Sequence, residues 1–370
     1  MKTRPTSERD FAAIQALHRH VGWPERSLAG WRWLHDNPAR IGTESPAGWV
    51  VDGPDGRPAA HVGNLVQRFC LGDQELRGAT GFSIIVTPAV RGASRDIFQT
   101  FLRQPGMFAA YTLNANSTSQ PLYARNRMTA WPEPTHALKL SWIIDPVPLA
   151  ISRLYRAAYR LAPDIVTRWG ERLMNGRLRA APRLDLPEGV SVLSDLGDAS
   201  PYAAFWTTLR AEGRLLADRS PETLRWRLAD PDLTDPPVIL AFDRGGVITG
   251  YAMAMMAKAN TLEAPVLEIL DLEALDGEVE AIPTLMKGLI AAARQMGTAK
   301  LRLQAISPRL YERLGDLAGS ARREGGWGHC HAWFSPDGPG PALWSPTPYD
   351  GDYAICLRPV PVRKTPKARR

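Results

Sequence analysis

The stretch "SIIVTPAVRGASRDIF", residues 83–98, says most about how this chain folds. An apolar run ends at Pro88, and a short turn with Arg91 and Gly92 leads into a helical pattern. A strand, a small-residue turn and a helix N-terminus gather backbone N–H groups in one concavity that favours a phosphate or pyrophosphate. Arg91 would add charge-assisted hydrogen bonds. The stretch therefore predicts an anion-binding loop, with a plain turn before a helix as the alternative.

Alternating strand and helix patterns surround this loop. Strands are expected at 47–52, 59–71, 79–88 and 107–116, and helices at 8–22 and 91–104. The turn formers "DGPDGRP" between the first two strands predict a hairpin. The second half of the chain has the same order of elements. Its strands are expected at 238–243, 247–256, 265–275 and 299–306, and its helices at 278–297 and 307–318.

Fixed points in the two halves support a duplication. Trp33 and Trp226 each precede a proline by five residues. Tyr123 follows Trp33 by 90 residues, and Tyr311 follows Trp226 by 85. Matching anchors in the same order predict two copies of one module. The expected fold class is therefore α/β (α+β), built as two tandem modules.

Two motifs of the first half resemble the GNAT acyltransferase superfamily. The segment "VTPAVRGAS" is similar to its coenzyme-A loop, V-x-P-x-x-R-G-x-G, through Val86, Pro88, Arg91 and Gly92. The segment "NSTSQPLYARNRM" is similar to the following motif, N-x-x-A-x-x-x-Y-x-x-x-G-F, through Asn116, Ser119 and Tyr123. The resemblance implies modules with a mixed, mostly antiparallel twisted sheet flanked by helices.

The resemblance also implies a function and a set of site residues. It implies transfer of an acetyl or other acyl group from acyl-CoA to an amine, with Tyr123 protonating the departing thiolate. The residues expected to bind the coenzyme are Val86, Arg91, Gly92, Ala93, Ser94, Asn116 and Ser119. Alternative readings are a packing aromatic for Tyr123 and, for Asn116, a cap of the following helix.

The sequence also departs from the family pattern. Ser94 and Asp96 stand where the loop has small residues, and Arg127 and Met128 replace the Gly-Phe pair. In the second half, Gln304 replaces the Asn. The equivalent loop there, "EALDGEVEAIP", is acidic and therefore a poor phosphate cradle. We expect the first module to bind acyl-CoA and the second, degenerate module to shape the acceptor cleft.

The general base is harder to assign. Asp271 lies in an apolar strand, where a carboxylate is unfavourable unless it is paired, so it is the first candidate. Its alternative reading is a structural hydrogen-bond acceptor. His61 is the second candidate, and its alternative reading is a half-buried, satisfied histidine.

The charge of +7 lies mainly outside the two modules. Residues 147–180 contribute seven Arg and two acids, or +5, and 361–370 contribute another +5, so the remainder sums to −3. The folded body is therefore not expected to bind nucleic acid. Arg153 and Arg156 share one face of an amphipathic stretch with Arg160. We expect a connecting helix; contact with an anionic membrane surface or with RNA is the alternative.

The composition also indicates the cellular compartment and argues against a membrane span and a metal site. The cysteines Cys70, Cys330 and Cys356 are scattered, which fits a reducing compartment. There is no run of about 20 apolar residues and no secretory signal pattern, so a cytoplasmic protein is expected. His329 and His331 would share a strand face, but two ligands make a weak site, and no metal is expected.

These observations predict four segments. They are an acyl-CoA-binding module at 1–145, a basic helical linker at 146–184, a degenerate module at 185–360 and a disordered basic tail at 361–370. The expected function is an acyl-CoA-dependent N-acyltransferase acting on a small-molecule amine, such as an amino sugar. The alternatives are a scaffold that kept the fold, and an acyltransferase whose donor is an aminoacyl-tRNA.

Overall fold

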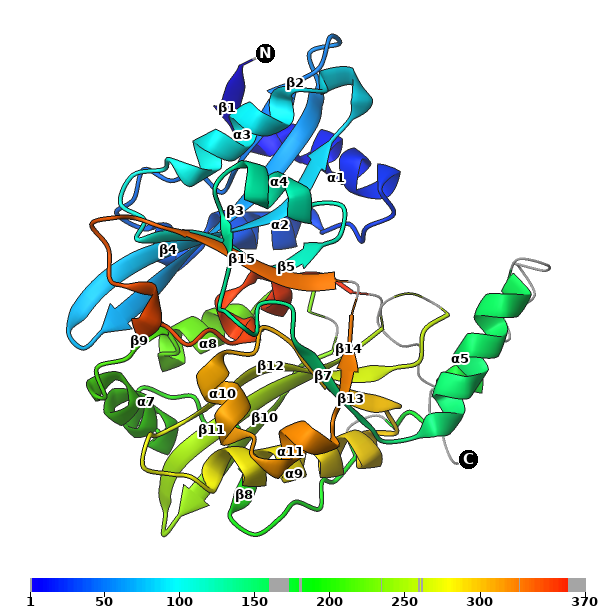
Figure 1. Ribbon diagram of the computed structural model, residues 1–370, viewed down its shortest axis with the longest axis vertical. Coiled ribbons are helices and arrows are strands. Elements are labelled where there is room, and N and C mark those ends of the chain that lie inside the picture. The colour runs from blue at the N-terminus through cyan, green and yellow to red at the C-terminus, as the bar shows by residue number, and fades with distance from the viewer. Residues whose placement is uncertain are drawn as a thin grey trace.

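A computed structural model describes residues 2–159, 173–179, 182–233, 235–258, 260, 262–325 and 327–358. Two twisted mixed sheets flanked by helices lie one above the other, and the C-terminal segment passes between them (Figure 1). The fold class predicted from the sequence is therefore confirmed.

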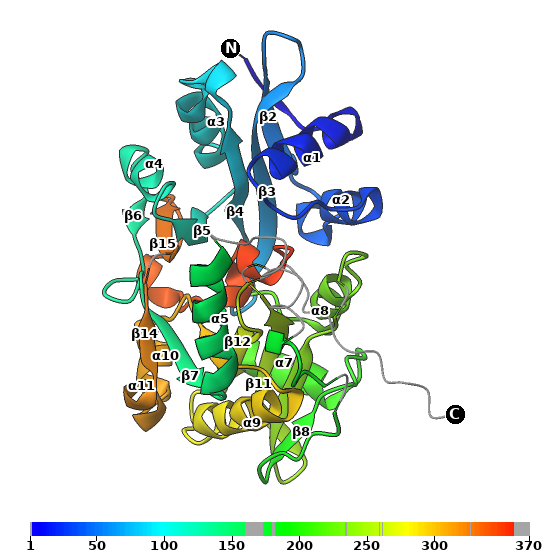
Figure 2. The ribbon, with the colours of Figure 1, turned by 90° about the vertical axis from the view of Figure 1, so that its right-hand side faces the viewer.

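The first sheet has eight strands in the order β1-β2-β3-β4-β5-β15-β6, and β9 pairs with one end of β3. The strands are β1 (Thr3–Pro5), β2 (Gly48–Asp52), β3 (Pro58–Leu71), β4 (Gln74–Val86), β5 (Ala109–Asn116), β6 (Thr129–Ala130), β9 (Leu215–Ala217) and β15 (Trp327–Phe334). Helices α1 (Phe11–His20) and α2 (Leu28–His35) lie on one side of this sheet, and α3 (Ala93–Leu102) and α4 (Gln120–Arg125) lie on the other (Figure 2). The predicted β2–β3 hairpin is confirmed, with antiparallel pairing.

The second sheet has seven strands in the order β14-β7-β13-β12-β11-β10-β8. They are β7 (Lys139–Ile143), β8 (Val190–Val192), β10 (Val238–Arg244), β11 (Val247–Ala257), β12 (Val266–Ala274), β13 (Lys300–Leu303) and β14 (Arg322–Glu324). The main helices around it are α7 (Pro201–Ala211), α8 (Pro221–Leu228), α9 (Ala281–Met296), α10 (Pro308–Arg313) and α11 (Asp316–Ser320). α9 buries apolar residues against one face of β11, and α7 packs on the other.

The two halves exchange their last strands. β7 comes from the first half but pairs with β13, placing Leu140 opposite Leu303. β15 comes from the second half but pairs with β5, placing Tyr111 opposite Ala332. Each donated strand covers an edge whose backbone groups would otherwise lack partners. The predicted boundaries therefore need correction, because 139–143 belongs to the second sheet and 327–334 to the first.

The tryptophan anchors of the duplication meet at the junction of the two modules. Trp33 on α2 and Trp226 on α8 stack with ring centroids 4.5 Å apart. The Trp33 indole N–H also donates to the Trp226 carbonyl at 3.0 Å. Each helix is capped by a serine, Ser27 or Ser220, whose hydroxyl accepts a first-turn N–H. The sequence anchors thus mark equivalent helices that pack against each other.

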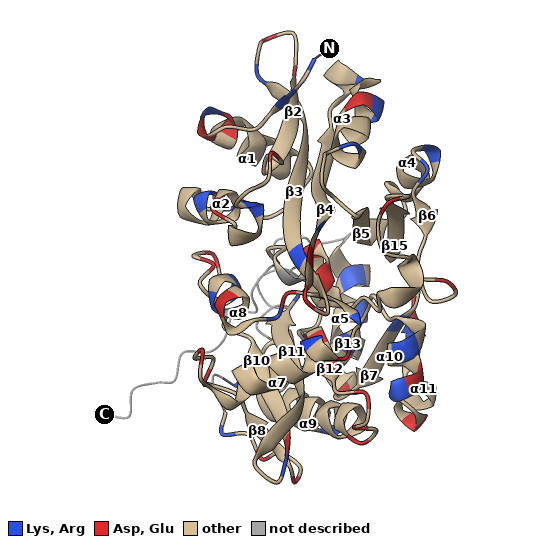
Figure 3. Cartoon of the chain, turned by 90° about the vertical axis from the view of Figure 1, so that its left-hand side faces the viewer, with Lys and Arg blue, Asp and Glu red and all other residues tan. Residues whose placement is uncertain are grey.

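The linker begins with α5 (Pro146–Tyr159), beside the second module (Figure 1). Arg156 pairs with Glu263 at 3.1 Å, while Arg153 and Leu154 are exposed. Arg160 and the predicted tail lie outside the described residues. None of the helices in the described part of the chain is long and apolar enough to cross a membrane. Charges of both signs are spread over both modules (Figure 3).

Candidate active site

The first sheet opens between its two central parallel strands. β4 and β5 pair only from Gly78 opposite Ala109 to Thr80 opposite Tyr111. Beyond these pairs β4 stays bonded to β3, and β5 to β15. The facing edges therefore carry backbone N–H and C=O groups with no strand partner across the gap, among the strands described. Such groups can bind an extended ligand.

A bulge in β4 lies beside this opening. Ser83 has φ +50°, and Ser83 and Ile84 together oppose the single residue between His61 and Gly63 of β3. The Nδ1–H of His61 donates to the Ser83 carbonyl at 3.2 Å. A peptide is planar and trans, so the Ile84 N–H points away from that carbonyl and from His61.

The geometry gives His61 a structural role. Its side chain is buried, and burial lowers its pKa to about 3. The neutral ring is a weak base, and the nitrogen that carries the proton is occupied by Ser83. The geometry therefore favours the alternative reading of His61, a satisfied histidine, over a general base. The ring is buried and not half-buried as expected, and it stabilises the bulge.

The predicted anion loop joins β4 to α3. Gly92 is the N-cap residue of α3 with φ +103°, in the region that favours glycine, and a Cβ there would meet no atom within 4 Å. No side chain caps this helix end, so its first-turn N–H groups remain available. Arg91 is exposed beside them, while Ala93 is buried and Ser94 partly exposed. Val86, the last residue of β4, is partly buried at the entrance to the loop.

The second predicted motif forms a compact turn at the end of β5. The side-chain oxygen of Asn116 accepts the N–H groups of Thr118 at 3.0 Å and Ser119 at 2.9 Å. The Ser119 hydroxyl in turn accepts the Asn116 N–H at 3.2 Å. Asn116 therefore stabilises the turn before α4, whereas the N-cap residue of that helix is Ser119, so Asn116 is not the helix cap of its alternative reading. Its exposed position also leaves it at the rim of the opening.

Tyr123 lies under this turn on the same side of the sheet as α3. Its ring is 4% exposed, stacks on His331 at 5.4 Å and meets the edge of Phe98 at 5.2 Å. Burial raises its pKa to about 12, against the effect of its hydrogen bonds with Thr112 and Ser119. The hydroxyl is therefore protonated at neutral pH, as a proton donor must be. Tyr123, Asn116 and Ser119 are brought together, with α3 packed beside them.

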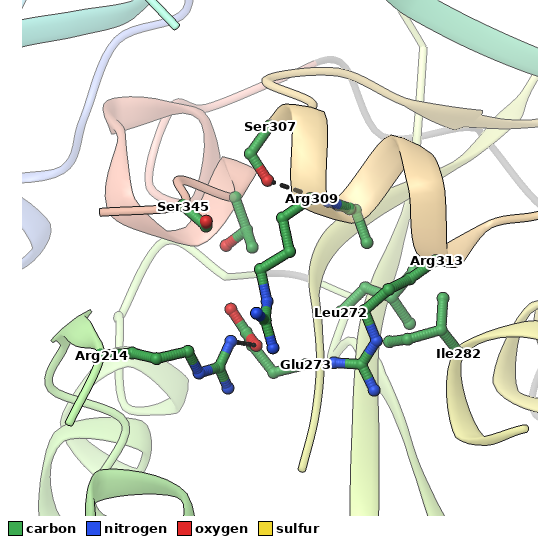
Figure 4. Close-up of a pocket in the computed structure, with 10 residues that line it drawn as sticks. Arg214, Leu272, Glu273, Ile282, Ser307, Arg309, Arg313 and Ser345 are labelled. Carbon is green, nitrogen blue, oxygen red and sulfur yellow. Dashed lines mark hydrogen bonds and ion pairs between the residues drawn. The ribbon is translucent and has the colours of Figure 1, made fainter. Parts of the chain in front are cut away.

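The equivalent opening in the second module is filled by the protein itself. β12 and β13 pair only over Val266–Glu268, as β4 and β5 do at their own start. Beyond that point the guanidinium of Arg313 donates to the carbonyls of Ala274, Leu275 and Glu278 at 2.8–3.1 Å. Figure 4 shows Arg313, Arg309 and Arg214 gathered around Glu273, where a cavity of about 10 Å³ remains. That space suits at most one water molecule.

The loop before α3 and the loop before α9 present different backbone groups. Before α9 the loop carbonyls face the Arg313 guanidinium, whereas a phosphate requires backbone N–H groups. Arg309 pairs with Asp276, and Arg244 pairs with Glu280 at 2.6 Å. The acidic loop of the second module is thus neutralised internally. α9, like α3, has no side-chain cap, so the two loops differ in the arginine that covers the second one and not in helix capping.

Asp271 belongs to the second module and is fully buried. Arg219 donates to its two oxygens at 2.8 and 3.2 Å, and the Thr347 hydroxyl donates at 2.7 Å. The Tyr251 hydroxyl also bonds to it. With these partners the carboxylate ties β12 to the C-terminal segment and has no oxygen facing an opening. The expectation of a general base is therefore replaced by its alternative, a structural acceptor.

A different carboxylate, Asp352, lies beside the opening. It is 6% exposed, its Oδ1 has no hydrogen-bond partner, and its Oδ2 accepts the Cys356 S–H at 3.2 Å. Burial raises its pKa to about 6. A Cβ on the preceding Gly351 would come within 3.0 Å of Leu113 on β5. Sequence reasoning placed "YDGDY" in turns, and no local signal indicated that this side chain would be buried.

No metal cluster accompanies these groups in the part of the chain that the structure describes. That part contains no set of three or more His, Cys, Asp or Glu side chains that could hold an ion. His331 instead packs on Tyr123, and burial lowers its pKa to about 4.

Comparisons with known proteins identify the fold. No protein-family model matches the chain, and no curated protein matches it. Among solved structures it is similar to N-myristoyltransferase from Saccharomyces cerevisiae, at 10% identity and TM-score 0.53, covering 93% of this chain and 84% of that one. It is similar to a probable N-acyltransferase from Enterococcus faecalis, at 11% identity and TM-score 0.51, covering 90% and 72%. It is also similar to a GCN5-related N-acetyltransferase from Anabaena variabilis, at 12% identity and TM-score 0.51, covering 90% of this chain and 72% of that one. These likenesses establish the tandem GNAT fold.

Proposed function

We propose that this chain, which has the tandem GNAT fold, is an acyl-CoA-dependent N-acyltransferase whose donor binds the first module. The observation that carries the proposal is the contrast between the two openings. Beside the first lies an uncapped helix end with Gly92 and Arg91, whereas the second is filled by Arg313. Its structural neighbours include a myristoyl-CoA complex and N-acetyltransferases, which supports the same donor class.

The coenzyme's charged and extended parts would contact different elements. The α3 N-terminus and Arg91 would bind the pyrophosphate, since helix N-termini and guanidinium groups both stabilise phosphate oxygens. The pantetheine arm would cross the opening, where the β4 and β5 edges offer unpaired backbone groups. Asn116 would then lie at its rim.

The reacting thioester would lie at the bulge. The Ile84 N–H would donate to the carbonyl oxygen as negative charge develops there, which is a backbone form of oxyanion stabilisation. Tyr123 would protonate the leaving thiolate. The acceptor is proposed to be a small-molecule amine, and contact of α5 with a membrane surface stays an untested prediction.

Isothermal titration calorimetry with acetyl-CoA and with myristoyl-CoA tests the donor site. Arg91→Ala should raise Kd about 10- to 100-fold, the value of a charge-assisted hydrogen bond of about 1.5–3 kcal/mol. Arg244→Ala is the matched control, because this exposed arginine flanks the equivalent loop of the second module. Absence of binding by the wild type, or equal effects of the two variants, would remove the proposal.

Turnover separates an enzyme from a scaffold. Release of free thiol from acetyl-CoA in the presence of amines supports transfer, whereas binding without release over the whole panel supports a scaffold. An aminoacyl-tRNA donor would require RNA affinity that falls steeply with salt. Loss of that affinity on neutralising Arg153 and Arg156 would favour the RNA donor.

A further inference from the structure

We propose that Asp352 is the general base of the first module, supplied from the C-terminal segment on the face of the sheet opposite Tyr123. The inference rests on the proposed function and deepens it, because it assigns the group that activates the acceptor amine.

The C-terminal segment connects the two sheets. Its turn η5 (Pro348–Asp350) packs on β12, and its turn η6 (Asp352–Ala354) packs on β4 and β5. Gly351 approaches Leu113, whereas Tyr123 bonds to Thr112. Neighbouring side chains of a strand point to opposite faces, so Asp352 and Tyr123 lie on opposite sides of β5. A thioester in the opening would therefore lie between them.

Two duplicated arginines hold this segment on both sides of Asp352. Arg219 donates to Asp350 at 2.9 Å, and Arg26 donates to the Ile355 carbonyl at 2.5 Å. Each arginine directly precedes the serine that caps α8 or α2. The equivalent positions of the two modules thus clamp one turn, which fixes Asp352 relative to β5.

Asp352 differs from the other buried carboxylates of this region. Asp271 and Asp350 are both paired with Arg219, and each has additional donors. Asp352 has only weak donors, the Cys356 thiol and its own backbone N–H, and its Oδ1 has no partner in another residue. The charged or titratable groups that interact with it are Cys356, Arg358, Tyr111, Tyr123 and Cys330. A buried carboxylate left with a free oxygen is unfavourable for folding, and functional sites are where such groups concentrate.

The proposed step balances as follows. The amine nitrogen bonds to the thioester carbon, and one N–H proton passes to Oδ1 of Asp352, directly or through one water molecule. The tetrahedral intermediate then collapses, the C–S bond breaks, and the thiolate takes the Tyr123 proton. Asp352 returns its proton through solvent to Tyr123. The net products are the amide and free CoA.

The test compares Asp352→Asn with the wild type, using acetyl-CoA as donor and aniline as acceptor. Aniline is far less basic than an alkyl amine and is largely uncharged near pH 6, so a fall in rate that begins there reports a group of the protein and not the acceptor. The wild-type kcat/KM should fall tenfold per pH unit below about 6, following the pKa of Asp352. The variant should lose at least about 100-fold in kcat and show no such limb. Its Kd for acetyl-CoA should stay within about twofold of the wild-type value, because Asp352 lies away from the phosphate loop.

Asp218→Asn is the matched control. Asp218 is as buried as Asp352, but its oxygens bond to Ser220, Thr223 and Arg68, so it stabilises the fold only. The Asp218→Asn variant should have a lower Tm than the wild type, and its kcat/KM should still fall below about pH 6. If Asp352→Asn keeps the limb, or loses less than about 10-fold in kcat, the assignment of Asp352 is overturned.

The same measurements distinguish this proposal from the proposed function. Hydrolysis of acetyl-CoA by water is the second readout, because it requires the same base. If Asp352→Asn binds acetyl-CoA and transfers the acetyl group at the wild-type rate, Asp352 is not the base, but the proposed donor site stands. If the wild type binds acetyl-CoA but neither transfers nor hydrolyses the acetyl group, the assignment of Asp352 as general base is also overturned. Absence of binding removes the proposed function.

Discussion

A base with an unpaired, buried carboxylate should lower the stability of the protein that contains it. The pKa of Asp352 is about 6 in the folded chain, against 3.8 for an ordinary aspartate. The difference of about 2.2 pKa units, at 1.36 kcal/mol per unit, makes ionised Asp352 destabilising by about 3 kcal/mol. An asparagine in its place would leave one amide donor unpaired, which costs about 1 kcal/mol. Asp352→Asn should therefore be more stable than the wild type by about 2 kcal/mol at pH 8.

The sign of the pH dependence follows from the raised pKa. The folded state holds its proton more tightly than the unfolded state, so the penalty is absent below pH 3.8 and complete above about pH 6. The advantage of Asp352→Asn should shrink as the pH falls through this window and vanish near pH 4.

Thermal and denaturant unfolding at pH 8 and pH 4 measure this effect. With an unfolding entropy of about 2.1 cal/mol/K for each of 370 residues, about 2 kcal/mol corresponds to a Tm rise of about 2–3 °C. Asp218→Asn should instead lower Tm at pH 8, because its carboxylate is fully bonded. Equal or lower stability of Asp352→Asn at pH 8, or a gain that persists at pH 4, would refute the reasoning.

Three further outcomes test the architecture. Gly92→Ala should weaken acetyl-CoA binding and destabilise α3 by about 1–3 kcal/mol, since φ +103° strains any side chain; calorimetry and Tm measure both. Arg219→Ala should destabilise by about 3–5 kcal/mol in urea unfolding, because it leaves two buried carboxylates without their cation. A fragment of residues 1–145 should show no cooperative unfolding transition by circular dichroism, because β5 loses its partner β15.

Much of each module follows from local patterns in the sequence. The hairpin of β2 and β3 comes from a turn-rich stretch between two apolar runs, and the anion loop from a strand, Arg91-Gly92 and a helix. These signals lie within a few residues of each other, so periodicity and turn chemistry suffice to place them. The duplication was visible for the same reason, as Trp33 and Trp226 occupy matching local contexts.

The roles of the carboxylates were decided by contacts distant in the sequence. Asp271 and Asp352 both lie in sequences that predict nothing about their partners. Arg219 is 52 residues from Asp271, and the fold brings it there while leaving Oδ1 of Asp352 unbonded. Asp271 was the first candidate for the general base because the apolar pattern of its strand predicts burial. No local pattern predicts that Arg219 lies beside it.

The sequence by itself indicated two copies of a strand–loop–helix unit, and it predicted that the first copy carries the phosphate loop. Only the tertiary structure decided that β7 and β15 change sheets and that the C-terminal segment brings Asp352 to the first opening. The physical reason is that strand edges and buried charges are satisfied by whichever group the folded chain brings near. That choice depends on packing across the whole chain, which no local stretch of sequence contains.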